Sequence, residues 1–338
     1  MIELPDESPE AILAEFESRG WGDGLPLIAP TAERVDLMLG GADPDEVVAV
    51  LAPRDGRADR RAIAVNAVLA GCRPDTMAVL VAAVRALAQP QINLRGVNAT
   101  THPVAPLLIV HGAVVDQVGF NGGLGAFGPG NRANATVGRA LRFVLLHIAG
   151  AVPGAGDAST QGQPSKYTYC VAENEPASPW GSYAASVGVD APSAVTVHCG
   201  ENPHNFHDME SASAERILGK ASSLMTTFGA NNACIATGEF FVGLCPEHAR
   251  TIADAGFDRG DVAQWLFDHA RRPAGEYRAH FDLRVWTDEM NAAADDDLIP
   301  PTGQVDNIKV LVVGGAGKHS CVIPSWGMTT SVTMALDT

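Results

Sequence analysis

The sequence is poor in basic residues, and lysine is especially scarce. Of its 338 residues, 23 are Lys or Arg and 39 are Asp or Glu, which gives a formal net charge of −16 at pH 7. The lysines are Lys166, Lys220, Lys309 and Lys318. A surface this acidic repels nucleic-acid phosphates and anionic lipid headgroups, so we expect neither nucleic acid nor a membrane as a partner.

Long apolar runs and a signal peptide are also missing. No run approaches the ~20 apolar residues that a membrane-spanning helix requires. The N-terminal sequence MIELPDESPEAILAEFESRG is acidic and lacks the basic and apolar segments of a signal peptide. Six scattered cysteines without a CxxC pair are typical of reduced thiols. These features predict a cytoplasmic globular protein with a small-molecule partner, and they leave a homo-oligomer open.

The apolar pattern predicts helices that alternate with strands. SPEAILAEFESRG predicts a helix capped by Ser8, and WGDGLPLIAPT predicts a loop. Further helices are expected over 58–71, 74–90, 135–150, 211–229 and 247–272. We expect an N-terminal helical and loop segment over 1–45 and an α/β core over 46–338. If the core has two subdomains, their boundary should lie near 150–165.

Four short apolar runs each end in a loop rich in Gly, His or Cys. These runs are PVAPLLIVHG, SAVTVHCGENPH, GEFFVGLCPEH and IKVLVVGGAGKH. Their length predicts buried strands, so the fold class is α/β around a mainly buried sheet of parallel or mixed strands. Ligands of such sheets bind outside the carboxyl ends of the strands. The loops that follow the four runs are therefore the expected place for a functional site.

The densest group of reactive side chains lies in HCGENPHNFHD. The residues predicted to bind a divalent transition metal (Zn, Fe or Cu) are His198, Cys199, His204 and His207. The spacing of His204 and His207 would bring both rings to one ion if the loop enters a helix. Glu201 or Asp208 would transfer protons. Alternatively, one of them would be a third ligand of the metal or would fix the tautomer of an imidazole ligand through a hydrogen bond. The competing interpretation is a polar loop with solvated histidines.

The segment VVGGAGKHSC predicts a second site, for an anionic group. Backbone N–H groups at Gly315 and Gly317, together with the ammonium of Lys318, would bind a carboxylate or phosphate. His319 and Cys321 follow as candidate catalytic residues. The segment is not a P-loop, because Val312 and His319 occupy positions where that motif needs Gly and Ser or Thr. The alternative is a tight turn with Cys321 buried beneath it.

Three weaker candidates lie earlier in the chain. The glycine-rich segment 122–128 could cover a small ligand as a flexible lid, with Arg132 or Arg139 pairing to a carboxylate. Cys170 on a predicted strand KYTYCVAEN could be a nucleophile activated by Lys166, although a strand cysteine more often packs in a core. His102, beside a proline, is either a ligand or a turn residue. The nucleophile motif GxSxG is absent from the sequence, so a serine hydrolase has little support.

Several segments resemble a family of uncharacterised bacterial proteins. The similar segments are WGDGLP, NATTHPVAPLLIV, GPGNRANATVGRALR and QPSKYTYCVAENE, and they extend over most of the chain. That family is loosely associated with a group of cysteine or selenocysteine proteins named for a UGSC motif. This chain lacks the motif, and its nearest string is GKHSC at 317–321. The resemblance implies an enzyme-like domain with thiol chemistry nearby and assigns no catalytic residue.

The sequence thus predicts an enzyme acting on a small anionic molecule, with metal-dependent lyase or hydrolase chemistry. One alternative is a metal-free enzyme in which a cysteine is the nucleophile or redox centre. Another is a ligand-binding subunit without catalysis of its own.

Overall fold

The computed structural model describes residues 8–337, which form an α/β fold as the sequence predicts. The helices are α1 Pro9–Ser18, α2 Ala32–Leu39, α3 Arg60–Ala70, α4 Met77–Leu87, α5 Leu94–Ala99, α6 Val114–Val118, α7 Arg132–Val144, α8 Tyr183–Ser186, α9 Ala214–Met225, α10 Pro246–Asp254, α11 Arg259–His269, α12 Ala274–His280 and α13 Asp288–Ala292. The strands are β1 Val47–Leu51, β2 Gly56–Asp59, β3 Ala105–Gly112, β4 Cys170–Ala172, β5 Ser193–Gly200, β6 His204–His207, β7 Phe240–Leu244, β8 Arg272–Pro273, β9 Leu298–Ile299, β10 Ile308–Val312, β11 His319–Pro324 and β12 Val332–Ala335.

Two four-stranded sheets form the centre, and both have the same strand pattern. The first has the order β12-β5-β3-β4 and the second the order β6-β11-β7-β10. In each sheet one pair is parallel, β3 with β4 and β7 with β10. The remaining pairs are antiparallel. The chain therefore repeats one topology, although the sequence shows no repeat of fixed period.

The two sheets exchange their edge strands. After β5 the chain leaves the first sheet at Gly200 and enters the second as β6, which pairs with β11. After β11 it returns to the first sheet as β12, which pairs with β5. An isolated bridge between Gly200 and Ser325 joins the two crossing points. The boundary expected near 150–165 falls between β3 and β4, which are neighbours in one sheet.

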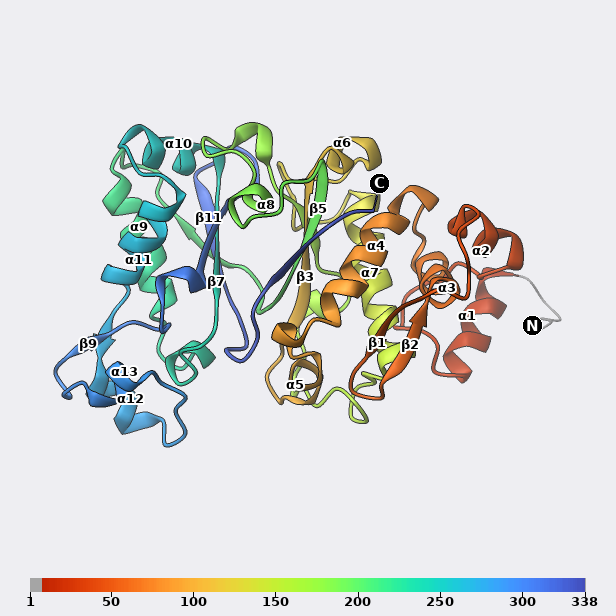
Figure 1. Cartoon of the computed structure of the whole chain (residues 1–338), viewed down its shortest axis with the longest axis horizontal. Coiled ribbons are helices and arrows are strands. Elements are labelled where there is room, and N and C mark those ends of the chain that lie inside the picture. The colour runs from red at the N-terminus through yellow and green to blue at the C-terminus, as the bar shows by residue number, and fades with distance from the viewer. Residues whose placement is uncertain (1–7, 338) are drawn as a thin grey trace.

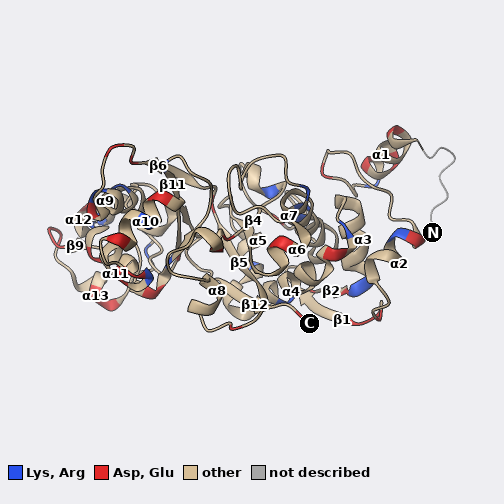
Figure 2. Cartoon of the chain, turned by 90° about the horizontal axis from the view of Figure 1, so that it is seen from above, with Lys and Arg blue, Asp and Glu red and all other residues tan. Residues whose placement is uncertain are grey.

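The sheets pack face to face, with helices on both outer sides (Figures 1 and 2). Side chains such as Leu107 and Ile109 of β3 meet Phe241 of β7 and Ile323 of β11 in the core between the sheets. The outer face of the first sheet packs on α4 and α7, and α3 packs on α7. The outer face of the second packs on α9, α10 and α11. The result is four layers, helix–sheet–sheet–helix, and burial on both faces explains why the strands are continuous apolar runs.

The N-terminal segment forms as its sequence predicts and is fastened to this core. Ser8 caps α1, its side chain accepting a hydrogen bond from the backbone N–H of Ala11. The loop WGDGLP is held by Arg139 of α7, whose guanidinium bonds both carboxylate oxygens of Asp23 at 2.7 Å. The carboxylate that Arg139 pairs with therefore belongs to the chain itself.

No single helix within residues 8–337 combines the length and hydropathy needed to cross a membrane. The segments Pro74–Leu87 and Pro90–Ala99 pass such a test only together, across a bend of 74°. The residues of α4 between Val79 and Leu87 are nearly all buried in the protein core.

The structure differs from the pattern of the sequence at three points. The carboxyl ends of the four apolar runs do not share one edge, because β5 is antiparallel to β3 and Gly200 lies opposite Ala105. The segment that contains His204 and His207 is the strand β6 and not the start of a helix. The predicted strand KYTYCVAEN is also shorter than expected, since only Cys170–Ala172 pair as β4.

Candidate functional site

The best-formed accessible group of reactive side chains centres on Glu201, immediately after β5. One carboxylate oxygen of Glu201 lies 3.0 Å from Nε2 of His102, and the other lies 3.2 Å from Nε2 of His204. His102 comes from the loop before β3, and His204 is the first residue of β6. We call these three residues the Glu201 cluster. It joins His102 to Glu201, 99 residues further along the sequence, at the point where the chain crosses between sheets.

The backbone around Glu201 is held in place by its neighbours. The N–H of Glu201 donates to the carbonyl of Pro324, and the hydroxyl of Tyr169 donates to the carbonyl of Glu201 at 2.7 Å. Gln163 donates its side-chain amide to the carbonyl of Gly200. The crossing point is thus fixed from both sheets, which positions the carboxylate between the two imidazoles.

The Glu201 cluster is partly open and carries negative charge. The side chains of His102, Glu201 and His204 are 12%, 19% and 33% exposed. Burial opposes ionisation of Glu201, but hydrogen bonds from His102 and His204 outweigh it and lower its pKa to about 2. Glu201 is therefore a carboxylate at neutral pH, with two imidazole nitrogens directed at it.

The four predicted metal ligands do not converge, which corrects that expectation. His198 points between the sheets, where its ring lies 4.5 Å from that of Phe241, whereas Cys199 lies in the core on the opposite face of β5. Neighbouring residues of a strand point to opposite faces, and so do residues three apart. His204 accordingly reaches Glu201, while His207 lies on the other face of β6 with its ring 5.4 Å from His319.

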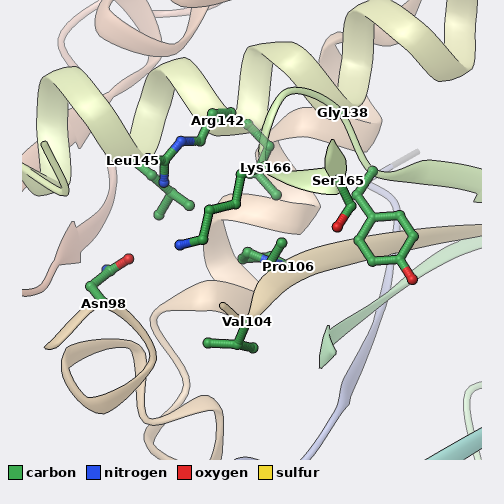
Figure 3. A pocket seen from close by; sticks show the side chains of 11 residues that line it. Asn98, Val104, Pro106, Gly138, Arg142, Leu145, Ser165 and Lys166 are labelled. Atoms are coloured by element: carbon green, nitrogen blue, oxygen red, sulfur yellow. The ribbon is translucent and has the colours of Figure 1, made fainter. Parts of the chain in front are cut away.

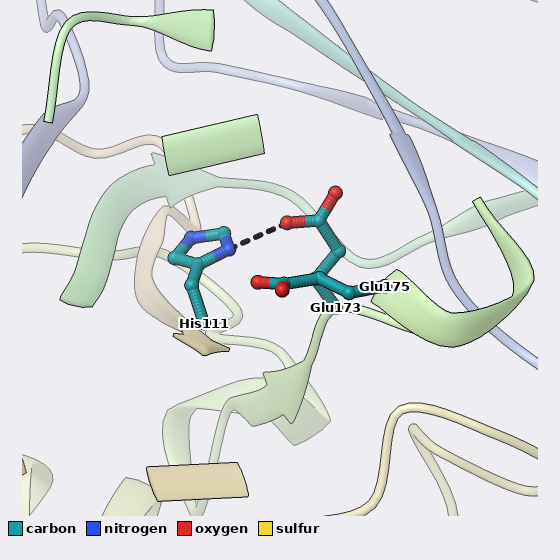
Figure 4. Close-up of side chains that lie close together, drawn as sticks. All are labelled: His111, Glu173 and Glu175. Carbon is teal, nitrogen blue, oxygen red and sulfur yellow. Dashed lines mark hydrogen bonds and ion pairs between the residues drawn. The ribbon is translucent and has the colours of Figure 1, made fainter. Parts of the chain in front are cut away.

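A second carboxylate–histidine group lies at the opposite end of the first sheet. Nδ1 of His111 is 2.8 Å from a carboxylate oxygen of Glu173, and Glu175 lies beside them (Figure 4). Their ligand atoms lie within 4.8 Å of one another, which would suit a metal ion. We call these three residues the Glu173 cluster.

Protein donors already occupy both carboxylate oxygens of Glu173 and one of the two of Glu175. Glu173 also accepts hydrogen bonds from the backbone N–H of Tyr183 and from the guanidinium of Arg259. Glu175 accepts from the N–H of Gly112 and the hydroxyl of Ser182. The other nitrogen of His111 bonds Thr196, and both His111 and Glu173 are 1% exposed. This arrangement is a buried hydrogen-bonded network rather than an open site.

The glycine turn after β10 does not present free anion-binding groups. The carboxylate of Glu247 already accepts hydrogen bonds from the backbone N–H of Gly317, at 3.0 Å, and of Lys318. Gly315 packs against the backbone of Leu124, and the ammonium of Lys318 bonds the carbonyl of Met209. Glu247 thus occupies the backbone N–H groups of Gly317 and Lys318, and an external anion would have to displace this carboxylate to bind as expected.

The remaining predicted site residues have structural partners. Arg132 donates to the carbonyl of Gly71 at the end of α3. His319 pairs with Asn205. Asp208 bonds Lys220 and Ser211, and these bonds lower its pKa despite the opposing effect of burial. None of these residues contacts the Glu201 cluster through a hydrogen bond within residues 8–337.

The cysteines do not have the environment of a nucleophile. All six are free, and Cys170, Cys199 and Cys321 are buried. Burial raises the pKa of Cys199 and of Cys321 to about 12, and it raises the pKa of Cys170 as well. Lys166, which was expected to activate Cys170, instead bonds Asp157 at 2.7 Å. Thiols held in the protonated form are poor nucleophiles and poor metal ligands.

Comparison with known proteins adds no assignment. No family model matches the chain, and neither a curated protein nor a solved structure matches it.

Proposed function

We propose that the protein is an enzyme whose reaction centre is the Glu201 cluster, with a divalent transition metal held by His102, Glu201 and His204. The observation that carries the proposal is the single carboxylate contacted on its two oxygens by the Nε2 atoms of two imidazoles. Two histidines and one carboxylate are a common ligand set of catalytic zinc and non-haem iron, and they leave coordination positions open for water and substrate.

The electrostatics of the cluster favour a cation. Glu201 remains ionised over the whole physiological pH range, because its pKa is about 2. In the absence of a metal, its charge is balanced by N–H groups of the two imidazoles. To hold a divalent ion, each ring would carry its proton on Nδ1 and offer the lone pair of Nε2. The two rings would also have to come closer together, because the three ligand atoms of the Glu201 cluster do not all lie within 4.8 Å of one another. His204, at the edge of the second sheet and one-third exposed, has room for that movement.

The chemistry that such an ion supplies is Lewis-acid catalysis or activation of water, which suits hydrolase or lyase reactions of a small anionic molecule. Tyr169 and Gln163 would keep Glu201 in place during the reaction through their bonds to its backbone and to Gly200. Six free thiols support a reducing, cytoplasmic setting.

A metal-free enzyme is the second candidate, and the pairing of Glu201 with His204 favours it. A carboxylate that accepts from one ring nitrogen fixes the tautomer of the histidine, whose other nitrogen can then exchange protons with a substrate. This function uses the same residues without an ion, so metal analysis distinguishes the two.

The test is elemental analysis of protein purified without an affinity tag and reconstituted with Zn²⁺, Fe²⁺ or Cu²⁺ under reducing conditions. We expect about one equivalent in the wild type and none in a His102→Ala/His204→Ala double variant. The matched control is His207→Ala/His319→Ala, which removes the exposed histidine pair of the same sheet and should keep the metal. Circular dichroism would verify that each variant is folded.

Three outcomes would contradict the metal proposal. If the wild-type protein stays metal-free after reconstitution, the metal-free enzyme is the remaining candidate. Metal lost from the control variant alone would place the ion at the surface pair. Metal retained by the His102→Ala/His204→Ala variant would move the search to the Glu173 cluster.

A further inference from the structure

A small cavity lies behind the Glu201 cluster, between α7, the turn Pro164–Lys166 and the segment that leads into β3. Its polar lining comes from Asn98, Arg142, Ser165 and Lys166, with Val104 among its apolar residues. Figure 3 shows the side chains of Arg142 and Lys166 entering the same space from α7 and the turn. The space is sufficient for about one water molecule. Tyr169 also lines the cavity, and its hydroxyl bonds the backbone of Glu201.

Positive charge is in excess in this cavity. The ammonium of Lys166 and the guanidinium of Arg142 contact the same oxygen of Asp157, at 2.7 and 3.1 Å. The other oxygen of Asp157 accepts from the backbone N–H of Ser159. The side chains of Arg142, Lys166 and Asp157 are 12%, 14% and 2% exposed. Two nearly buried cations are therefore matched by one carboxylate, which is costly unless a further anion is present.

Hydrogen-bond donors are in excess as well. The hydroxyl of Ser165 is buried and has no hydrogen-bond partner. The ammonium of Lys166 uses one of its three N–H groups, in the bond to Asp157. Burial is the main cause that lowers the pKa of Lys166, and the charge of Arg142 lowers it further. Unused donors and uncompensated charge in one buried space together indicate a missing acceptor.

We propose that the cavity between Arg142, Ser165 and Lys166 is a binding site for a small monoanion. Because the space is sufficient for about one water molecule, the anion that fits best is a single small halide ion such as chloride. It would neutralise the excess positive charge and fix the turn Pro164–Lys166, which lies just before Tyr169.

The experiment measures thermal unfolding of the full chain at constant ionic strength. Sodium gluconate, whose anion is too large for the cavity, is replaced stepwise by chloride, bromide or formate. We expect a saturating rise in Tm of about 3–6 °C at a hundredfold excess over Kd. Lys166→Met and Ser165→Ala should abolish or weaken the rise. Lys220→Met is the matched control, because it removes a lysine that pairs with another buried carboxylate and should keep the full response.

The outcomes separate this proposal from the proposed function, because the measurement needs neither metal nor turnover. Equal Tm values in gluconate and in all three small anions would overturn the anion site. An unchanged response in both Lys166→Met and Ser165→Ala would also overturn it, and Ser165→Ala carries the test alone if Lys166→Met does not fold. Saturation by chloride with little or no response to the larger formate supports a free-ion site of this size. Saturation by formate alone would overturn the proposal, because the cavity has no room for a carboxylate.

Discussion

Glu173 and Glu201 each accept a hydrogen bond from a histidine ring, yet they lie at opposite ends of the first sheet in different surroundings. Glu173 follows β4 and is enclosed by α8, β3 and the side chain of Arg259. Glu201 follows β5, at the crossing between the sheets, where solvent reaches all three members of its cluster.

The difference lies in how the remaining hydrogen-bonding capacity is used. Around Glu173 it is taken by a backbone N–H, a guanidinium and, through His111, by Thr196. Around Glu201 the carboxylate is shared by two imidazoles, and Nδ1 of His102 is buried without a partner. Histidine and glutamate side by side therefore indicate a reactive site only where their other bonds remain unused.

The largest expected effect is on stability, at the Glu173 cluster. Glu173→Ala leaves His111, Arg259 and the N–H of Tyr183 without their shared acceptor in a buried setting. We expect a loss of about 3–5 kcal/mol in the free energy of unfolding, measured by urea denaturation. Glu201→Gln, in a partly solvated site, should cost about 2 kcal/mol or less. A greater loss from Glu201→Gln than from Glu173→Ala would reverse the comparison.

The second prediction concerns acid stability. The pKa of Glu201 in the folded protein, about 2, is below its ordinary value of 4.5, so its ionised form stabilises the fold. That contribution is fully present above about pH 4.5 and is lost as the pH falls towards 2. It amounts to at most about 3 kcal/mol, since partial exposure weakens it.

The measurement is the difference in unfolding free energy between wild type and Glu201→Gln at pH values from 6 to 2.5. Other carboxylates, such as Asp208, contribute to both proteins and cancel. We expect the difference to shrink as the pH falls. A difference that stays constant over this range would show that Glu201 is not stabilised by its imidazole partners.

The smallest predicted effect is a ratio of modification rates. Diethyl pyrocarbonate, followed by peptide mass spectrometry, should modify His204 at least about tenfold faster than His111, because one side chain is one-third exposed and the other is buried. The exposed residues His207 and His319 serve as positive controls. Comparable rates at His111 and His204 would mean that the Glu173 cluster opens readily to solvent. The Glu173 cluster would then be a second candidate functional site.

The sequence predicts much of the fold. A helix that buries one face has regularly spaced apolar residues, and a strand buried on both faces is a continuous apolar run. The helices near 58–71, 74–90 and 211–229 and the strands β3, β5, β7 and β10 are confirmed. The strands β11 and β12 were not predicted. Neither the antiparallel pairing of β5 nor the crossing to β6 leaves a local signal, since pairing depends on segments far apart in the chain.

The site was predicted only in part, and for the same reason. Glu201, His204 and His102 were each singled out, but with separate roles, because nothing local shows that residues 102 and 201 meet. His198 and Cys199 are adjacent in sequence and were grouped for that reason, yet strand alternation separates them. Nothing local in the sequence shows that Arg142, Asp157 and Lys166 lie together, because α7 and the turn bring them into contact only in the folded chain.

The exchange of edge strands has a consequence for synthesis of the chain on the ribosome. Until residues 332–335 emerge, the edge of β5 that β12 will cover is an open row of N–H and C=O groups. A polypeptide stopped before residue 332 can form most of both sheets but leaves that edge free to pair with other chains. Early termination before or within these four residues should therefore favour aggregation. The first sheet is complete only when β12, the last strand of the chain, has paired with β5.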